Sequence, residues 1–275
     1  MMRQIGSDFI KGNPNVNHNI TIGLISLSLA LGGCGSSPSM TSAQLASLAQ
    51  QVAAIEASEW GLAPGLPRET KLRGWVSNLL ASPSVMEAAK EKPASMSWKQ
   101  WGEGLAADGL PLFSDEVLRR FLSARARLHS EATDAECAAK MRVDTGRGSP
   151  IDADIWRQRL ARVSEDDFEN LVRTIYEATA LRAGQHSDRP FRLNETEKGL
   201  GMQAILDAAR KTHGAAEVSF VLATVRRVQT GTQRPESLPP GELCDLMRTI
   251  NSGAATASGP NTGVALRVLF DPAHR

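Results

Sequence analysis

The sequence predicts an all-α protein, an irregular multi-helix bundle with one short C-terminal segment that has the pattern of a strand. Three observations support this fold class. Aromatic residues make up 5% of the chain, with a single tyrosine, whereas Ala, Leu, Arg and Glu are abundant, and such a composition favours helices over strands. Apolar residues recur at intervals of three and four along most of the chain. Several segments also begin with capping residues and end at glycine.

The first predicted helix belongs to residues 41–63. Its apolar residues follow a heptad spacing at Leu45, Leu48, Val52 and Ile55, but two heptads are too few for a stable isolated coiled coil. We expect this stripe to pack on the body of the protein, and the alternative is a dimer or a partner helix. Two glycines and two prolines between Gly61 and Pro67 end the helix and separate it from a globular domain at residues 64–275.

The globular domain contains several helices with recognisable starts. Ser114 is an N-cap, Thr133 and Glu136 form a capping box, and Asn194 caps a later helix with Glu197 three residues on. Predicted helices cover residues 113–128, 163–184, 193–214, 215–231 and 239–250. We expect residues 251–263, which are mostly small, to form a flexible loop, and residues 264–271 to form the strand.

Residues 1–33 have the organisation of a signal peptide. Arg3 and Lys11 precede an uncharged, mostly apolar run from Ile20 to Gly33. That run is shorter than the about 20 apolar residues that a membrane-spanning helix needs. The segment that ends at Cys34 reads Leu-Gly-Gly-Cys, and it resembles the lipobox of bacterial lipoproteins, whose pattern is apolar, small, small, Cys.

This resemblance implies that a signal peptidase cuts after Gly33 and that Cys34 carries a diacylglycerol and an added acyl chain such as palmitate. Residues 34–40 would then be a lipidated tether to the membrane. Each buried methylene contributes about 0.8 kcal/mol, and two or more chains suffice for stable anchoring. Gly35 follows the cysteine where an aspartate would resemble an inner-membrane retention signal, so the resemblance implies an outer-membrane protein that faces the periplasm. The alternative is a free cysteine after an ordinary cleavage site.

The charge balance excludes some classes of partner. The chain has 31 basic and 30 acidic residues, and removal of residues 1–33 takes away Arg3, Lys11 and Asp8. The mature chain is therefore neutral, which argues against nucleic acid, whose binding depends on an excess of Lys and Arg.

The two other cysteines, Cys137 and Cys244, form an even pair once Cys34 is lipidated. In an oxidising compartment we expect a structural disulfide between them. The alternative is a pair of buried thiols.

Other polar clusters have structural interpretations. Glu165, Asp166, Asp167 and Glu169 lie in a predicted first helical turn, where negative charge complements the helix dipole. Asp152 and Asp154 lack the glycine and the distal glutamate of a calcium loop. The basic run Arg119, Arg120, Arg125, Arg127 and His129 is expected to be a solvated helix face, with an anionic partner as the alternative.

The sequence contains no convergent catalytic set, and we predict no catalytic residue, no metal ligand and no cofactor. His129, His186, His213 and His274 are scattered, without the spacing of a zinc motif. Two tryptophans, Trp98 and Trp101, lie three residues apart and are expected in a core; a sugar groove beside Glu103 is the alternative.

The leading hypothesis is therefore a non-enzymatic, lipid-anchored cell-envelope protein that binds a protein partner as a scaffold, adaptor or inhibitor. The alternative is a periplasmic enzyme of the helical lysozyme-like type that acts on peptidoglycan.

Overall fold

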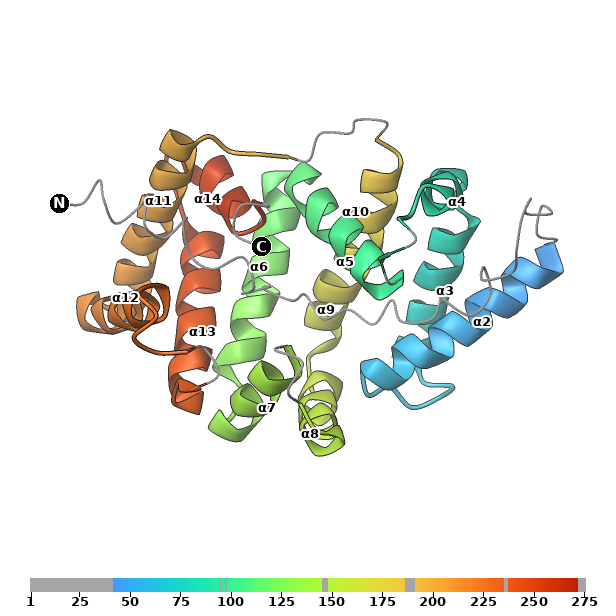
Figure 1. The fold of residues 1–275 in the computed structure, drawn as a ribbon, viewed down its shortest axis with the longest axis horizontal. Helices are drawn as coiled ribbons and strands as arrows, with labels where there is room; N and C mark the ends of the chain where they lie inside the picture. The colour runs from blue at the N-terminus through green and yellow to red at the C-terminus, as the bar shows by residue number, and fades with distance from the viewer. Residues whose placement is uncertain are drawn as a thin grey trace. The chain divides into compact units, whose positions relative to one another are not determined.

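The computed structural model describes residues 42–93, 95–96, 98–144, 148–185, 191–234 and 237–271. Within these ranges the chain forms helices and no strand (Figure 1), which confirms the predicted all-α class. The described residues fall into two compact units. Unit 1 contains residues 113–171 and those after 190, and unit 2 contains the residues before 113 together with residues 172–185.

Unit 2 is formed by helices from the first part of the chain and by one later helix. It contains α2 (Ser42–Glu59), α3 (Pro67–Ala81), α4 (Pro83–Lys90), α5 (Trp98–Gly109), the short η2 (Leu110–Leu112) and α10 (Thr174–Ala183). Helix α10 contacts α3, α4 and α5, and α2 packs against α3. Val52 is buried and Ile55 is half-buried, so the described part of the predicted heptad stripe packs within this unit.

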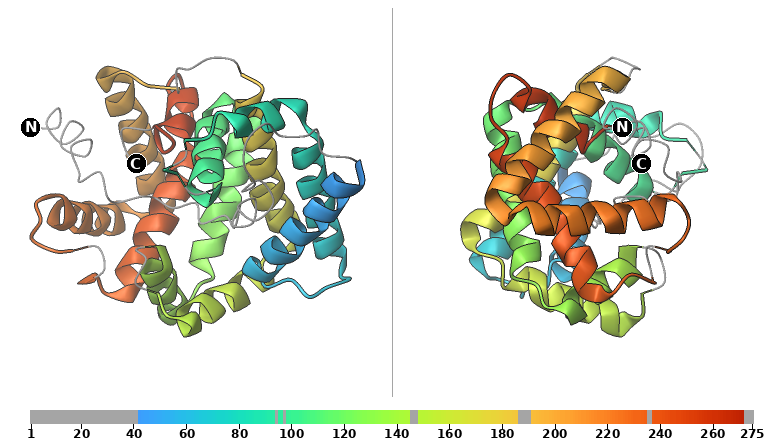
Figure 2. Two further views of the ribbon diagram at one scale, coloured as in Figure 1. Left: turned by 45° about the vertical axis from the view of Figure 1, so that its right-hand side comes forward. Right: turned by 90° about the vertical axis from the view of Figure 1, so that its left-hand side faces the viewer.

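Unit 1 is larger, and its long helices lie beside one another. It contains α6 (Asp115–Ser130), α7 (Asp134–Asp144), α8 (Pro150–Ala161), α9 (Glu165–Phe168), α11 (Glu195–His213), α12 (Ala215–Gln229), α13 (Pro240–Thr256) and α14 (Thr262–Val268). Helix α13 lies between α6 and α11 (Figure 1). Figure 2 shows α12 lying across α11 and α13, both of which it contacts.

Most predicted helix starts are confirmed by hydrogen bonds. The backbone amide of Val117 donates to the hydroxyl of Ser114 at 3.5 Å. Asn194 and Glu197 form a complete capping box. Helix α13 begins at Pro240, where the missing proline N–H removes no helical hydrogen bond.

The predicted helix at 163–184 is present, with one irregular turn. A π-helical segment, η3 (Glu169–Arg173), lies between α9 and α10. Four apolar residues of this segment share one face and are buried: Phe168, Leu171, Val172 and Ile175. The boundary between the two units falls inside η3.

The predicted strand at 264–271 and the predicted loop at 251–263 are both wrong. Helix α13 continues to Thr256, and α14 replaces the first part of the strand. The small residues of α13 allow a close contact with α11, because a Cβ at Gly253 would lie 2.6 Å from the carbonyl oxygen of Ile205. Ala265, Leu266 and Val268 of α14 are buried, and the described residues offer no strand edge with which a strand could pair.

Candidate functional site

The predicted lipid attachment site and the signal peptide lie outside the described residues, so Cys34 stays a prediction. His186 and His274 also lie outside them. Among the described residues, no helix combines the length and hydropathy needed to cross a membrane. No group of three His, Cys, Asp or Glu side chains among them is arranged to hold a metal ion.

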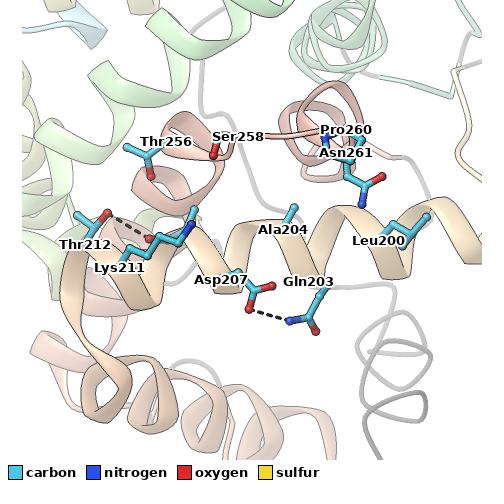
Figure 3. A pocket seen from close by; sticks show the side chains of 11 residues that line it. Leu200, Gln203, Ala204, Asp207, Lys211, Thr212, Thr256, Ser258, Pro260 and Asn261 are labelled. Atoms are coloured by element: carbon cyan, nitrogen blue, oxygen red, sulfur yellow. Dashed lines mark hydrogen bonds between the residues drawn. The ribbon is translucent and has the colours of Figure 1, made fainter.

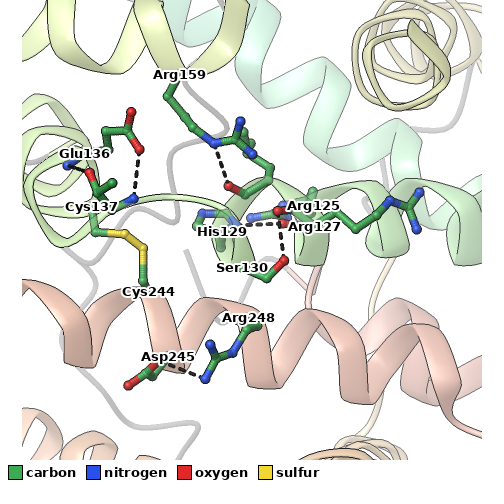
Figure 4. Close-up of a disulfide and its surroundings, with 12 residues drawn as sticks. Arg125, Arg127, His129, Ser130, Glu136, Cys137, Arg159, Cys244, Asp245 and Arg248 are labelled. Atoms are coloured by element: carbon green, nitrogen blue, oxygen red, sulfur yellow. Dashed lines mark hydrogen bonds and ion pairs between the residues drawn. A yellow bond between two sulfur atoms is a disulfide. The ribbon is translucent and has the colours of Figure 1, made fainter. Parts of the chain in front are cut away.

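Cys137 and Cys244 are joined by a disulfide that links α7 to α13 (Figure 4). Their Cα atoms lie 5.7 Å apart, which is an ordinary spacing for this bond. Both cysteines are buried. The capping box before Cys137 is also present, because the amide of Thr133 donates to Glu136 at 2.8 Å and the amide of Glu136 donates to the Thr133 hydroxyl at 3.3 Å. The disulfide therefore links the first turn of α7 covalently to α13.

The acidic clusters belong to helix starts, as their sequence positions indicated. Ser164 caps α9, and Asp167 in its first turn accepts a hydrogen bond from Arg127 Nε at 2.9 Å. Ser149 and Asp152 form the capping box of α8. The Arg142 guanidinium beside Asp152 holds the pKa of that carboxyl well below its usual range, with help from the Ser149 amide.

The basic run on α6 is solvated in part, because Arg120 and Arg127 are exposed, Arg119 and Arg125 are half-buried, and His129 is buried. Arg119 donates to the carbonyl oxygen of Ala255 at 2.6 Å, Arg120 pairs with Glu116, and Arg127 pairs with Asp167. These positive charges neutralise carboxylates or hold the end of α13. Three of the arginines therefore have partners within the protein, and an anionic partner for the run stays a prediction.

His129, the last member of that run, is buried (Figure 4). Its Nδ1 atom lies 2.7 Å from the carbonyl oxygen of Arg125, so Nδ1 carries the proton and donates it. Its Nε2 atom has no hydrogen-bond partner among the described residues. Burial, and next the nearby charge of Lys140, lower the pKa of His129 to about 3, so the ring is neutral at physiological pH.

The region predicted as a tryptophan core lies in unit 2. Trp101 and Glu103 are on α5, and both side chains are half-buried. Trp98 begins the same helix, and its side chain is outside the described set. The described contacts therefore do not assemble a glycan groove around Glu103, and that alternative stays a prediction.

Unit 2 contains a buried polar pair that the sequence did not indicate. Tyr176 of α10 donates its hydroxyl proton to Glu56 of α2 at 3.0 Å. Glu56 is fully buried, and Tyr176 is 3% exposed. Burial, and next the charge of Glu56, raise the pKa of Tyr176 well above its usual value. The pair connects two helices that are distant in sequence.

A pocket of about 320 Å³ lies in unit 1 on the exposed side of α11 (Figure 3). Its lining comes from α11, from the last turn of α13 and from the loop before α14. It contains both polar and apolar residues: Leu200, Gln203, Ala204, Asp207, Ala208, Lys211, Thr212, Thr256, Ser258, Pro260 and Asn261. Within it Gln203 donates to Asp207 at 2.8 Å. A pocket of this size, lined by hydroxyl, amide and charged groups, suits a small polar ligand or a polar side chain of a partner.

Beside this pocket the structure brings together a serine, a histidine and a glutamate. Ser252 Oγ of α13 lies 2.5 Å from Nε2 of His213 at the end of α11. Nδ1 of His213 lies 3.5 Å from Oε1 of Glu217, in the first turn of α12. The His213 and Glu217 side chains are 15% and 30% exposed, so the group is open to solvent on one side.

Sequence reasoning missed this group because its members come from three helices. His213 and Glu217 are four residues apart, but Gly214 between them ends one helix and starts the next with φ of 87°. Ser252 lies in the stretch that was predicted to be a flexible loop. A prediction with the correct end of α13 would have put Ser252 on a helix. It would still not have shown the contact with His213, because that contact depends on the packing of α13 against α11.

Comparisons with known proteins find no matching family model, no similar curated protein and no similar solved structure.

Proposed function

We propose that the protein is a lipid-anchored component of the bacterial cell envelope. In this proposal residues 1–33 are removed, Cys34 carries the lipid, and the helical body faces the periplasm from the outer membrane. The observation that carries the proposal is the Leu-Gly-Gly-Cys segment that follows an uncharged apolar run. The buried disulfide of unit 1 supports it, because such bonds persist in oxidising compartments.

The anchor is tested by metabolic labelling with radioactive palmitate in a bacterium that expresses the full chain. We expect label in the wild type, loss of label in Cys34→Ser, and release of that variant from the membrane fraction. A variant with Cys137→Ser and Cys244→Ser is the matched control and should keep its label. Label retained in Cys34→Ser would refute the anchor.

The body of the protein, in this proposal, binds a partner protein as a scaffold, adaptor or inhibitor. The pocket of unit 1 is the surface that best supports this role, because it combines the charges of Asp207 and Lys211 with exposed apolar area from Leu200, which is 44% exposed. Mixed polar and apolar surfaces of this kind are typical of protein recognition sites.

Partner binding is tested in cells with a photo-reactive amino acid incorporated at Gln203, on the rim of the pocket. Incorporation at Glu87, an exposed residue of α4 in unit 2, is the control. We expect a discrete cross-linked product from position 203 that is absent from position 87. No product at 203, or the same products at both positions, would contradict the assignment of the pocket as the docking surface.

A further inference from the structure

Ser252, His213 and Glu217 have the order of contacts that activates a serine hydroxyl. We propose that Ser252 is a nucleophile that accepts an acyl group from small polar esters, with His213 as its general base and Glu217 as a positioning residue. This activity goes beyond the proposed function and does not depend on the lipid anchor. The contacts that carry it are 2.5 Å between Ser252 Oγ and His213 Nε2, and 3.5 Å between His213 Nδ1 and Glu217 Oε1.

The proposed role of His213 requires one tautomer, with the ring proton on Nδ1. A carboxylate accepts and does not donate, so the nitrogen that faces Glu217 carries the ring proton. Nε2 then presents its lone pair to the hydroxyl of Ser252. The carbonyl oxygen of Thr249 competes for the same hydroxyl proton at 3.2 Å, but the histidine contact is shorter by 0.7 Å. In the proposed reaction the hydroxyl turns from the Thr249 carbonyl oxygen to Nε2 of His213, which acts as the base.

Glu217 is held in its charged form by neighbours on α13. Burial alone would raise the pKa of Glu217, but the Arg248 guanidinium, which donates to Oε1 at 2.7 Å, lowers it below the usual value. The Thr249 hydroxyl donates to the same oxygen at 3.3 Å. The carboxylate therefore remains negative at neutral pH and can stabilise the imidazolium that forms when His213 takes a proton.

The proposal places the substrate in the neighbouring pocket. Thr256, which lines the pocket, donates its hydroxyl to the carbonyl oxygen of Ser252 at 2.7 Å. One helical turn, or about 6 Å along the axis, therefore separates the two residues. Thr212 lines the pocket next to His213. Because the lining is rich in hydroxyl and amide groups and the volume is small, the acyl donor that fits is a small polar ester.

The reaction balances with water as the only co-reactant. Ser252 Oγ attacks the ester carbonyl carbon, and its proton passes to His213 Nε2. The C–O bond to the alcohol breaks, and the departing oxygen takes the proton from His213. Water then adds to the acyl-serine carbonyl while His213 accepts a proton from it, and the serine–acyl bond breaks with return of that proton to Oγ. The products are one carboxylic acid and one alcohol.

The position of Ser252 inside α13 sets the expected rate. Its neighbouring backbone amides in α13 belong to the hydrogen-bond ladder of the helix, so they do not form an oxyanion hole. Loss of a single oxyanion donor reduces the rate constant by about 10² to 10³ in known enzymes. We therefore expect slow turnover, and covalent labelling of Ser252 is a sharper measurement than steady-state hydrolysis.

The experiment treats the full chain, purified in detergent, with a fluorophosphonate probe and locates the adduct by peptide mass spectrometry. We expect an adduct on Ser252, no adduct in Ser252→Ala, and labelling about 100-fold slower in His213→Gln, a typical contribution of a general base. Ser219→Ala is the matched control. Ser219 is an exposed serine whose hydroxyl donates to the backbone of its own helix at 2.8 Å. Without a histidine contact, it should remain unlabelled wherever it is present.

The role of Glu217 needs a readout that simple stability does not change. Labelling of Ser252 should slow in Glu217→Gln, and Glu217→Asp, which keeps a carboxylate, should recover part of the wild-type rate. Circular dichroism of each variant confirms the fold. No adduct on Ser252 in a folded wild type, equal labelling of Ser219, or unchanged labelling in His213→Gln would each overturn the proposal.

Discussion

Both units contain close approaches between helices at glycine, but unit 1 adds a covalent bond, whereas unit 2 adds a buried hydrogen bond between Tyr176 and Glu56 and an ion pair between Arg182 and Asp108. In unit 1 the disulfide connects α7 to α13, and Arg127 is paired with Asp167. In unit 2 a Cβ at Gly109 of α5 would overlap the carbonyl oxygen of Ala178 in α10. The comparison indicates that unit 1 is sensitive to redox chemistry and pH, and that both units are sensitive to side-chain volume.

The largest effect should follow removal of the disulfide. The bond closes a loop with a sequence separation of 107 residues, for which the chain-entropy model gives about 4 to 5 kcal/mol as an upper value. We expect Cys137→Ala with Cys244→Ala to lower the urea midpoint of unit 1, measured by hydrogen exchange of α7 and α13. A reducing agent should reproduce the loss in the wild type and have no further effect on the double variant. If the double variant unfolds at the wild-type midpoint, the contrast between the units fails.

Enlarging Gly109 should be the most damaging single change in unit 2. Gly109→Ala forces α5 and α10 apart, and we expect a loss of about 3 kcal/mol, the upper end of the usual cost of overpacking. Gly104→Ala on the same helix is the control, because a Cβ there meets no atom within 4 Å and alanine has the higher helix propensity. Chemical denaturation of both variants measures the difference. Equal stabilities would show that the close approach is not a constraint.

Acidification should weaken unit 1 through His129. Its pKa is about 3 in the folded protein, against 6.5 for the ordinary value, so the unfolded chain binds the proton more readily. Stability is therefore lost as pH falls from about 6.5 toward 3, and the loss reaches about 2 kcal/mol at pH 5. The slope of unfolding free energy between pH 7 and pH 5 should be smaller in His129→Gln. A wild-type slope that the substitution leaves unchanged would exclude His129 as its source.

The smallest effect should come from the hydrogen bond between Tyr176 and Glu56. Tyr176→Phe removes the hydroxyl that donates to Glu56 at 3.0 Å, and we expect a loss of about 1 kcal/mol. Glu56→Gln keeps an acceptor oxygen and should cost less, provided that the tyrosine still donates to it. Thermal unfolding followed by the hydrogen exchange of α2 and α10 separates the two variants. A larger loss in Glu56→Gln would mean that the charge, and not the hydrogen bond, stabilises the pair.

Local signals in the sequence predicted the fold class and the helix starts well, because capping depends on residues that are close in sequence. Ser114, Thr133 and Asn194 each accept the amide hydrogen bond expected of a cap. The end of α13 was missed for the opposite reason. Gly253 and its small neighbours do not resemble a helix in sequence. They allow the close contact with Ile205 of α11, and a local sequence pattern does not reveal such a contact.

The sites were harder to predict than the helices. We expected His129 on a solvated face because its neighbours are arginines, and Arg120 and Arg127 are indeed exposed, yet the His129 ring is buried. The group around Ser252 depends on the packing of α11, α12 and α13, and Ser252 and His213 are 39 residues apart. Only the disulfide was indicated directly, because cysteine number and compartment restrict the possible pairs.

The long separation of the two paired cysteines also has a consequence for biosynthesis. In the proposed export, Cys137 enters the oxidising compartment before Cys244, which follows 107 residues later. During that interval the only other cysteine in the chain is Cys34, so an early bond could form only between residues 34 and 137. A thioether-linked lipid on Cys34 would remove this competing thiol. Lipid attachment would then also ensure that Cys137 pairs with Cys244. A lipid-free variant that keeps Cys34 would form the wrong bond between Cys34 and Cys137.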